Sequence, residues 1–124
     1  LDIAQEKMPK AKLYEGDFTK ALDKSILSEK YDAILATYSL HHIIDSEKKD
    51  FLKALLSLLN DGGKIFIGDV SFVDLASLEA CREESKDYWD DDEHYLVYES
   101  IKKDFPKAIF EKISFCSGVL ILEK

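Results

Sequence analysis

The sequence predicts an α/β domain in which a doubly wound sheet of mostly parallel strands ends in an antiparallel hairpin. Residues 31–37 and 64–70 are nearly unbroken apolar runs of strand length, which is typical of parallel strands covered on both faces. A helical apolar pattern separates them, so the chain is expected to cross from strand to helix to strand. Near its end, residues 109–115 and 118–123 form two strand-like runs around a short turn, which predicts the hairpin.

The segment before residue 31 predicts a helix, a strand and a second helix. Residues 1–8 follow a helical apolar pattern that stops before Pro9. Residues 11–15 predict a short strand, and helical spacing resumes over residues 18–26. We therefore expect residues 31–37 to be a central strand of the sheet.

The remainder of the chain predicts three more helices. Asp45 is the expected N-cap of the first, whose apolar stripe continues to residue 59. The Asn-Asp-Gly-Gly sequence at residues 60–63 is expected to end it. Two further helices are expected near residues 75–88 and 93–105.

Composition describes one ordinary globular domain over residues 1–124, with 46% hydrophobic and 34% charged residues. Seventeen basic residues against 25 acidic ones give a net charge of -8, which opposes binding to phosphate backbones or anionic lipid. We therefore expect neither nucleic acid nor a membrane as a partner. The longest apolar stretch, residues 52–59, is far shorter than the ~20 residues that a membrane-spanning helix needs.

Two cysteines, Cys81 and Cys116, lie far apart and outside any C-x-x-C pattern. This spacing predicts neither a disulfide framework nor a thiolate zinc site. The expected compartment is the reducing cytoplasm.

Residues 88–98 are rich in acidic and aromatic side chains. The acidic run at 90–93, with His94 after it, matches no calcium loop, and a solvated helix start explains its charges, so no metal is expected. The aromatic side chains Tyr88, Trp89, Tyr95 and Tyr98 could cover a bound ligand or complete a core.

Candidate ligand-binding residues follow the predicted strands, because ligands in doubly wound sheets gather beyond the carboxyl ends of the strands. Asp17 could accept a hydrogen bond from an exocyclic amine, with Phe18 covering the ring plane beside it, as in an adenine site. Alternatively, Asp17 caps the next helix and Phe18 packs in the core.

A phenol and two imidazoles follow the strand at residues 31–37. Tyr38, His41 and His42 could orient a substrate there or remove a proton near neutral pH. Adjacent histidines cannot face the same way in regular structure, so one is expected to be structural, and His42 is the better candidate for that role. Tyr38 and His41 are therefore the candidate catalytic residues. Asp69, at the end of the next strand, could line a cleft or only bind backbone amides.

Three segments resemble, in order and spacing, the later half of a class I S-adenosylmethionine-dependent methyltransferase of the small-molecule type. They are AQEKMPKAKLYEGDF, YDAILATYSLHHI and LLSLLNDGGKIFIGDVSF. The resemblance implies a partial Rossmann-like fold and S-adenosylmethionine as the cofactor. It implies that Asp17 meets the adenine amino group and Phe18 flanks the ring. It also implies that Thr37 and Tyr38 line the path between the methionine moiety and the acceptor, with no metal required.

The sequence departs from this family where the family's first two strands would be. The acidic residue and Gly-x-Gly loop of the first strand are not found, and Gly62-Gly63 cannot replace them because it follows a helix and precedes a strand. We therefore expect the chain to be the downstream part of a longer enzyme. Without neighbouring strands, residues 31–37 would become an exposed apolar edge that self-associates or pairs with residues 11–15.

The sequence therefore predicts methyl transfer from S-adenosylmethionine to a small-molecule acceptor by the parent protein, with the isolated chain inactive. The proposed catalytic residues are Tyr38 and His41, and the proposed cofactor-binding residues are Asp17, Phe18 and Thr37. The alternative is a non-catalytic module that makes protein contacts, which the missing glycine loop favours. An unrelated doubly wound domain ranks last, because no phosphate-binding or acidic cluster is visible near a first strand.

Overall fold

A computed structural model describes residues 1–16, 18 and 22–124 of the chain. Its helices and strands follow one another in this order: α1 (Asp2–Lys7), α2 (Lys24–Leu27), β1 (Tyr31–Thr37), the 3₁₀ helix η1 (Leu40–His42), α3 (Asp45–Ser57), β2 (Leu59–Phe72), α4 (Leu75–Glu84), β3 (Leu96–Val97), α5 (Tyr98–Asp104), β4 (Ile109–Ser114) and β5 (Ser117–Glu123).

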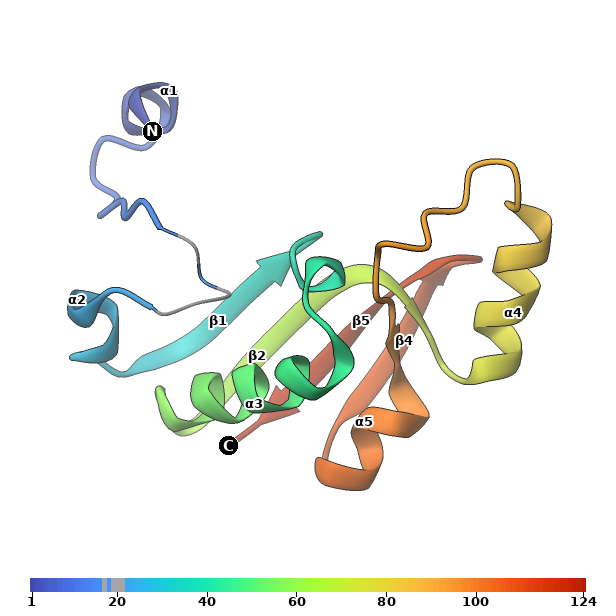
Figure 1. Cartoon of the computed structure of the whole chain (residues 1–124). Coiled ribbons are helices and arrows are strands. Elements are labelled where there is room, and N and C mark those ends of the chain that lie inside the picture. Colours follow the sequence, from blue (N-terminus) through green and yellow to red (C-terminus); the bar gives the residue numbers. More distant parts are fainter. Residues whose placement is uncertain (17, 19–21) are drawn as a thin grey trace.

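The sheet is mixed, so the prediction of mostly parallel strands is wrong. Its order is β1-β2-β5-β4, with the two-residue β3 also paired to β2. The pairs β1–β2 and β2–β3 are parallel, whereas β2–β5 and the predicted hairpin β4–β5 are antiparallel. The parallel crossover that the apolar runs predicted is present, but the hairpin fills the other side of β2 (Figure 1).

The position of β1 also corrects the sequence prediction. β1 lies at an edge of the sheet, and no strand of the described part of the chain covers its outer side. Residues 11–15, the predicted strand, have no regular structure. Leu35 in β1 is 72% exposed. The apolar run was typical of a strand with neighbours on both sides, and only one neighbour lies within these residues.

One face of the sheet carries the core, and α3 and α5 lie in front of it in Figure 1. Leucines of α3 and Ile101 of α5 pack with buried residues of β2 and β5 in one cluster. The alternation in these strands turns Ile65, Ile67, Leu120 and Leu122 toward that cluster. This packing fixes β2, whose carboxyl end carries the polar residues described below.

The helix predicted over residues 1–8 is confirmed as α1, which lies apart from the sheet (Figure 1). α1 buries none of its residues. The helix predicted over residues 18–26 includes residues 19–21, which lie outside the described residues. The short α2 begins near the end of this range, and its N-cap Asp23 accepts a hydrogen bond from the Ser25 backbone N–H at 2.8 Å.

Several element boundaries differ from prediction. The N-cap of α3 is Ile44, so Asp45 is the first residue of the helix rather than its cap. α3 is followed almost at once by β2, and the glycine pair lies inside that strand, where Gly62 has a φ of 78°. The helix expected over 93–105 begins only at Tyr98, because the backbone before it forms β3.

A disulfide joins Cys81 of α4 to Cys116 in the turn between β4 and β5. The expectation of no disulfide is therefore wrong. The sequence separation of 35 hid the pairing, since only the folded hairpin brings Cys116 to α4, with a Cα–Cα distance of 6.1 Å. A stable disulfide does not fit the reducing compartment expected from the cysteine pattern.

None of the helices in the described residues combines the length and the apolar character that crossing a membrane requires.

Candidate functional site

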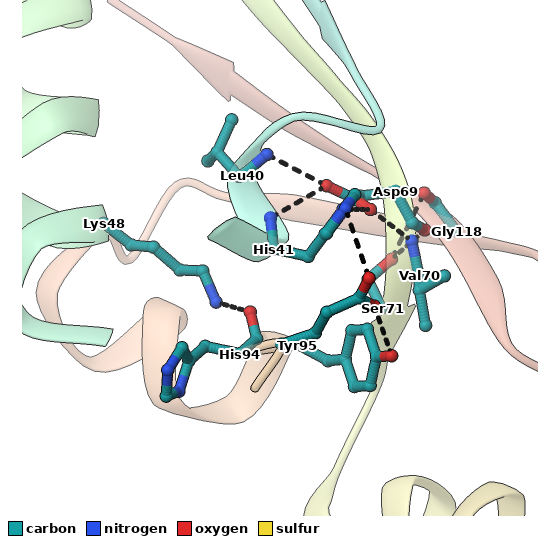
Figure 2. A network of polar contacts seen from close by, with 10 residues as sticks. Leu40, His41, Lys48, Asp69, Val70, Ser71, His94, Tyr95 and Gly118 are labelled. Carbon is teal, nitrogen blue, oxygen red and sulfur yellow. Dashed lines mark hydrogen bonds and ion pairs between the residues drawn. The ribbon is translucent and has the colours of Figure 1, made fainter. Parts of the chain in front are cut away.

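A buried carboxylate at the carboxyl end of β2 organises the site. Asp69 is 3% exposed. Its Oδ2 accepts hydrogen bonds from the backbone N–H groups of Leu40 at 3.1 Å and His41 at 3.3 Å, and its Oδ1 accepts one from Val70 at 2.8 Å (Figure 2). These bonds fasten η1 to β2 and provide the partners that a buried carboxylate requires.

The same carboxylate holds the His41 imidazole. Nδ1 of His41 lies 2.8 Å from Oδ1 of Asp69, and the His41 side chain is 13% exposed. A carboxylate only accepts hydrogen bonds, so Nδ1 carries the hydrogen of this contact and Nε2 is the ring nitrogen left for other partners. The arrangement is that of an oriented general base.

The loop of residues 85–95, between α4 and β3, brings an acidic side chain to the other ring nitrogen. Oε1 of Glu93 lies 3.8 Å from Nε2 of His41. The Tyr95 hydroxyl donates a hydrogen bond to Oε2 of Glu93 at 2.5 Å. Burial raises the pKa of Tyr95, and Glu93 adds to the shift, so this phenol remains a donor. His41 therefore lies between two carboxylates.

The two other polar residues after β1 are placed differently. Tyr38 has a φ of 50° and is 66% exposed, and its backbone N–H donates to the Gly68 carbonyl at 2.8 Å. His42 is exposed, with its ring centroid 4.0 Å from that of His41. The structure therefore connects His41, rather than His42, to buried polar partners, against the expectation that His42 has the structural contacts.

Two predicted cofactor-binding residues line one cavity of about 520 Å³ beside β1. Phe18 and Thr37 both border it, together with Ser39, and the Phe18 ring lies 5.4 Å from that of Phe51. Among the described residues, Tyr38 and His41 lie outside the set that lines this cavity. Asp17 lies outside the residues that the structure describes.

Most of the aromatic residues of 88–98 pack against other side chains, as expected if they complete a core. The Tyr95 ring meets Trp89 edge-on at 5.0 Å and Phe72 at 6.3 Å, which places it in a packed cluster. Tyr98 joins the core and its hydroxyl donates to the Ala108 carbonyl at 2.7 Å. Tyr88 is 91% exposed.

Glu93 and Lys48 were not among the residues predicted for the site. The acidic run that contains Glu93 was interpreted as a solvated helix start, but it lies in the loop before β3, and no local pattern distinguishes Glu93 from its neighbours. A signal for Lys48 does exist. It precedes Leu52 by four residues and Leu55 by seven, which places it on the buried face of α3.

The sequence of the chain is similar to those of uncharacterised methyltransferases. No protein-family model matches the chain. An uncharacterised methyltransferase of Anoxybacillus flavithermus is 34% identical over 85 residues, which cover 68% of this chain and 39% of the relative. An uncharacterised methyltransferase of Oceanobacillus iheyensis is 28% identical over 123 residues, covering 92% of this chain and 55% of the relative. The chain therefore spans about 39 to 55% of the length of these relatives.

A solved structure supports the fold assignment. The magnesium protoporphyrin IX methyltransferase of Synechocystis PCC 6803, solved with bound S-adenosylhomocysteine (SAH), aligns with a TM-score of 0.64 and 16% identity. The alignment covers 99% of this chain and 57% of that protein. At this level of identity the similarity shows a shared fold.

Proposed function

We propose that this chain is part of a class I S-adenosylmethionine-dependent methyltransferase, because it shares that fold and is similar in sequence to uncharacterised methyltransferases. The proposed reaction is methylation of a small-molecule acceptor whose proton is taken by His41. The observation that carries the proposal is the hydrogen bond between His41 and Asp69, at 2.8 Å. S-adenosylmethionine, when bound, supplies an electrophilic methyl group. The task left to this chain is to orient the acceptor and to remove its proton.

His41 performs the proton transfer in this proposal. Nε2 would accept the proton of the acceptor as the acceptor atom bonds to the methyl carbon and the methyl–sulfur bond of the cofactor breaks, which leaves SAH as the second product. Asp69 keeps Nδ1 protonated and balances the positive charge that the ring gains. Glu93, 3.8 Å from Nε2, faces the nitrogen that takes the proton. The proton then leaves to solvent from Nε2, which restores the neutral base.

The cavity beside β1 is the proposed site for the cofactor's adenosyl group. Its walls are apolar and aromatic, and Phe18 and Thr37 border it at the carboxyl end of β1. An apolar slot with an aromatic wall fits a flat purine ring. Asp17 is the proposed acceptor for the adenine amino group. We assign the methionine part of the cofactor to no residue of this chain.

Tyr38 is proposed to orient the acceptor. Its exposed phenol follows Thr37 directly, and its left-handed backbone conformation turns the chain from β1 into η1. Tyr38→Phe removes the hydroxyl without changing the ring and is expected to raise KM for the acceptor.

A second candidate function is a non-catalytic interaction module. The outer side of β1, which no described strand covers, favours it. In that case the His41–Asp69 pair would hold η1 on β2 and have no chemical role.

Calorimetric titration of SAH separates the two functions. We expect binding by a longer protein that carries this sequence, and weak or no binding by the 124-residue chain. In the longer protein, Phe18→Ala should weaken the binding of SAH. Phe115→Ala should leave it unchanged, because Phe115 lies on the distant hairpin turn and is 52% exposed.

The opposite results are equally informative. Failure of the longer protein to bind SAH would contradict the enzyme hypothesis and favour the module. Tight binding by the 124-residue chain would show that these residues suffice and that the contribution of other segments was overestimated.

A further inference from the structure

Lys48 is a fully buried lysine whose role the proposed reaction does not explain. It is 1% exposed on α3. Its ammonium donates to the backbone carbonyl of His94 (Figure 2). The ammonium also lies 3.3 Å from Oδ1 of Asp45, a side chain that is 80% exposed. Burial lowers the pKa of the ammonium, while Asp45 and, more weakly, Asp69 act in the opposite direction. A buried cation persists only where its partners compensate for lost hydration.

The partner of Lys48 is the backbone of the loop that faces His41. The backbone of His94 is held on both sides. Its N–H donates to the His41 carbonyl at 2.8 Å, and its carbonyl accepts the hydrogen bond from Lys48. Figure 2 shows the Lys48 side chain reaching from α3 to this carbonyl. The loop is therefore tied to η1 and to α3 at a single residue.

The residue just before this anchor is Glu93. Fixing the backbone of His94 limits where the Glu93 carboxylate can lie relative to Nε2 of His41, now 3.8 Å away. Tyr95, just after the anchor, holds the other oxygen of Glu93. A further side-chain contact of the loop, between Arg82 and Asp91 at 3.2 Å, is exposed and contributes little to its position.

We propose that Lys48 is a positioning residue: by holding the His94 carbonyl, it keeps the Glu93 carboxylate beside Nε2 of His41. Its importance for catalysis rests on the proposed function, but its effect on the loop does not. Besides Glu93, the titratable groups that face the imidazole are Asp69 from β2 and His42 from η1. Neither belongs to the 85–95 loop, and Lys48 interacts only weakly with Asp69, so its main effect on these groups is through Glu93.

Hydrogen exchange measured residue by residue by NMR in the full chain tests the proposal. Lys48→Met keeps the apolar stem but leaves the His94 carbonyl without its donor. We expect the His94 amide, which bonds to His41, to exchange about tenfold faster or more, as for the loss of one hydrogen bond to a charged group. Amides of the β2–β5 ladder should keep their rates.

Lys49→Met is the matched control. Lys49 is the next residue of α3, and its ammonium pairs with Asp104 of α5 at 2.6 Å, so its loss removes the same charge without touching the loop. The His94 amide should then exchange as in the wild type. Lys48→Arg keeps a charged donor and should restore most of the protection. If Lys48→Met does not fold, Lys48→Leu, which also lacks a hydrogen-bond donor, takes its place.

A second readout reports on the imidazole itself. At one fixed pH, the ¹⁵N shift of His41 Nε2 should move in Lys48→Met in the same direction as in Glu93→Gln, and should not move in Lys49→Met. An unchanged His94 exchange rate in Lys48→Met would overturn the proposal. So would a loss of protection spread equally over the whole sheet, which would make Lys48 a residue of general stability. Neither readout requires cofactor or turnover, so failure here is distinguishable from failure of the methyltransferase proposal.

Discussion

At the scale of single residues, Asp69 couples backbone structure to side-chain orientation. Its carboxylate receives three backbone N–H groups and one imidazole N–H. The backbone of His41 and its ring thus depend on the same acceptor, which limits both movements of η1 and rotations of the ring. An oriented base of this kind is effective because little reorganisation remains when the proton moves.

The carboxylate of Asp74 leads us to predict that the stability of the fold depends on pH. Asp74 caps α4, and its Oδ1 accepts the Ser77 backbone N–H at 2.8 Å. Hydrogen bonds from Ser77 hold the pKa of Asp74 below its ordinary value. A lowered pKa means that this contribution to stability is present above the unfolded value of about 3.8 and is lost as the pH falls through the folded value.

Thermal unfolding followed from neutral pH down to about pH 2 checks this prediction. Asp74→Ala should lower the melting temperature by about 2 to 6 °C at neutral pH. The difference from the wild type should shrink in acid. Asp74→Asn keeps a capping oxygen and should retain most of the stability without that pH dependence. An equal deficit of Asp74→Ala at all pH values would contradict the role of the ionised carboxylate.

The sequence predicted some of these residues and not others, for identifiable reasons. His41 and Asp69 were recognisable because each follows a strand, where side chains of an α/β sheet converge. Their contact joins residues 28 positions apart, and its geometry requires the fold. Of the two interpretations of Asp69, the bonds to backbone amides are confirmed, whereas a place in a cleft wall stays a prediction. Glu93 depends on the path of an irregular loop, which no periodicity encodes.

At the scale of elements, β2 is the central strand that connects the rest of the sheet to the candidate site. It pairs with β1 along one side and with β5 along the other, and its carboxyl end carries Asp69. Beyond that residue, the Ser71 hydroxyl donates to carbonyls of Asp69 and Gly118, and its backbone N–H donates to the Cys116 carbonyl at 3.2 Å. The hairpin turn and its disulfide therefore support the strand end that positions the base.

Reduction of the disulfide should destabilise this part of the chain. The bond between Cys81 and Cys116 closes a loop across a sequence separation of 35, and its loss should lower the free energy of unfolding by about 2 to 4 kcal/mol. Urea unfolding with and without dithiothreitol measures the difference. The double variant Cys81→Ala/Cys116→Ser should have the same free energy of unfolding as the reduced protein, and dithiothreitol should not change it. Equal stability of the oxidised and reduced chains would contradict the prediction.

Elements with a complete local signal were predicted well, and elements that depend on context were not. The hairpin and the strand of residues 31–37 carry their own apolar patterns and are confirmed. Residues 11–15 lack a partner strand and have no regular structure. The start of α5 shifted to Tyr98 because residues 96 and 97 pair with β2, a tertiary interaction.

At the scale of the whole molecule, one face of the sheet is covered, and β1 and β4 are its edge strands in the described residues. The core cluster fills the side of α3 and α5, whereas Leu35 of β1 and Ile109 of β4 remain more than half exposed. Leu35, Phe66, Ile121 and Ile109 are neighbours in register across the sheet and form one apolar row. Such an edge and row favour association through β1.

We therefore predict that the 124-residue chain associates with itself in a concentration-dependent manner in sedimentation velocity experiments. Leu35→Lys, at the β1 edge, should shift the population toward monomer, because a charge there opposes edge pairing. Ile113→Lys is the control, since Ile113 is similarly exposed, at 66%, but lies in β4 at the opposite edge. A compact monomer at all concentrations, with protected amides in β1, would contradict this prediction.

The central claim is that His41, oriented by Asp69, takes the proton of a small acceptor during methyl transfer. Turnover of tritiated S-adenosylmethionine by the longer protein, with a panel of small phenols and amines as acceptors, tests it most directly. His41→Gln and Asp69→Asn should each lower kcat by about 100-fold or more and leave KM for S-adenosylmethionine unchanged. His42→Gln, which alters the exposed neighbour, should retain activity. A His41→Gln protein as active as His42→Gln would contradict the account.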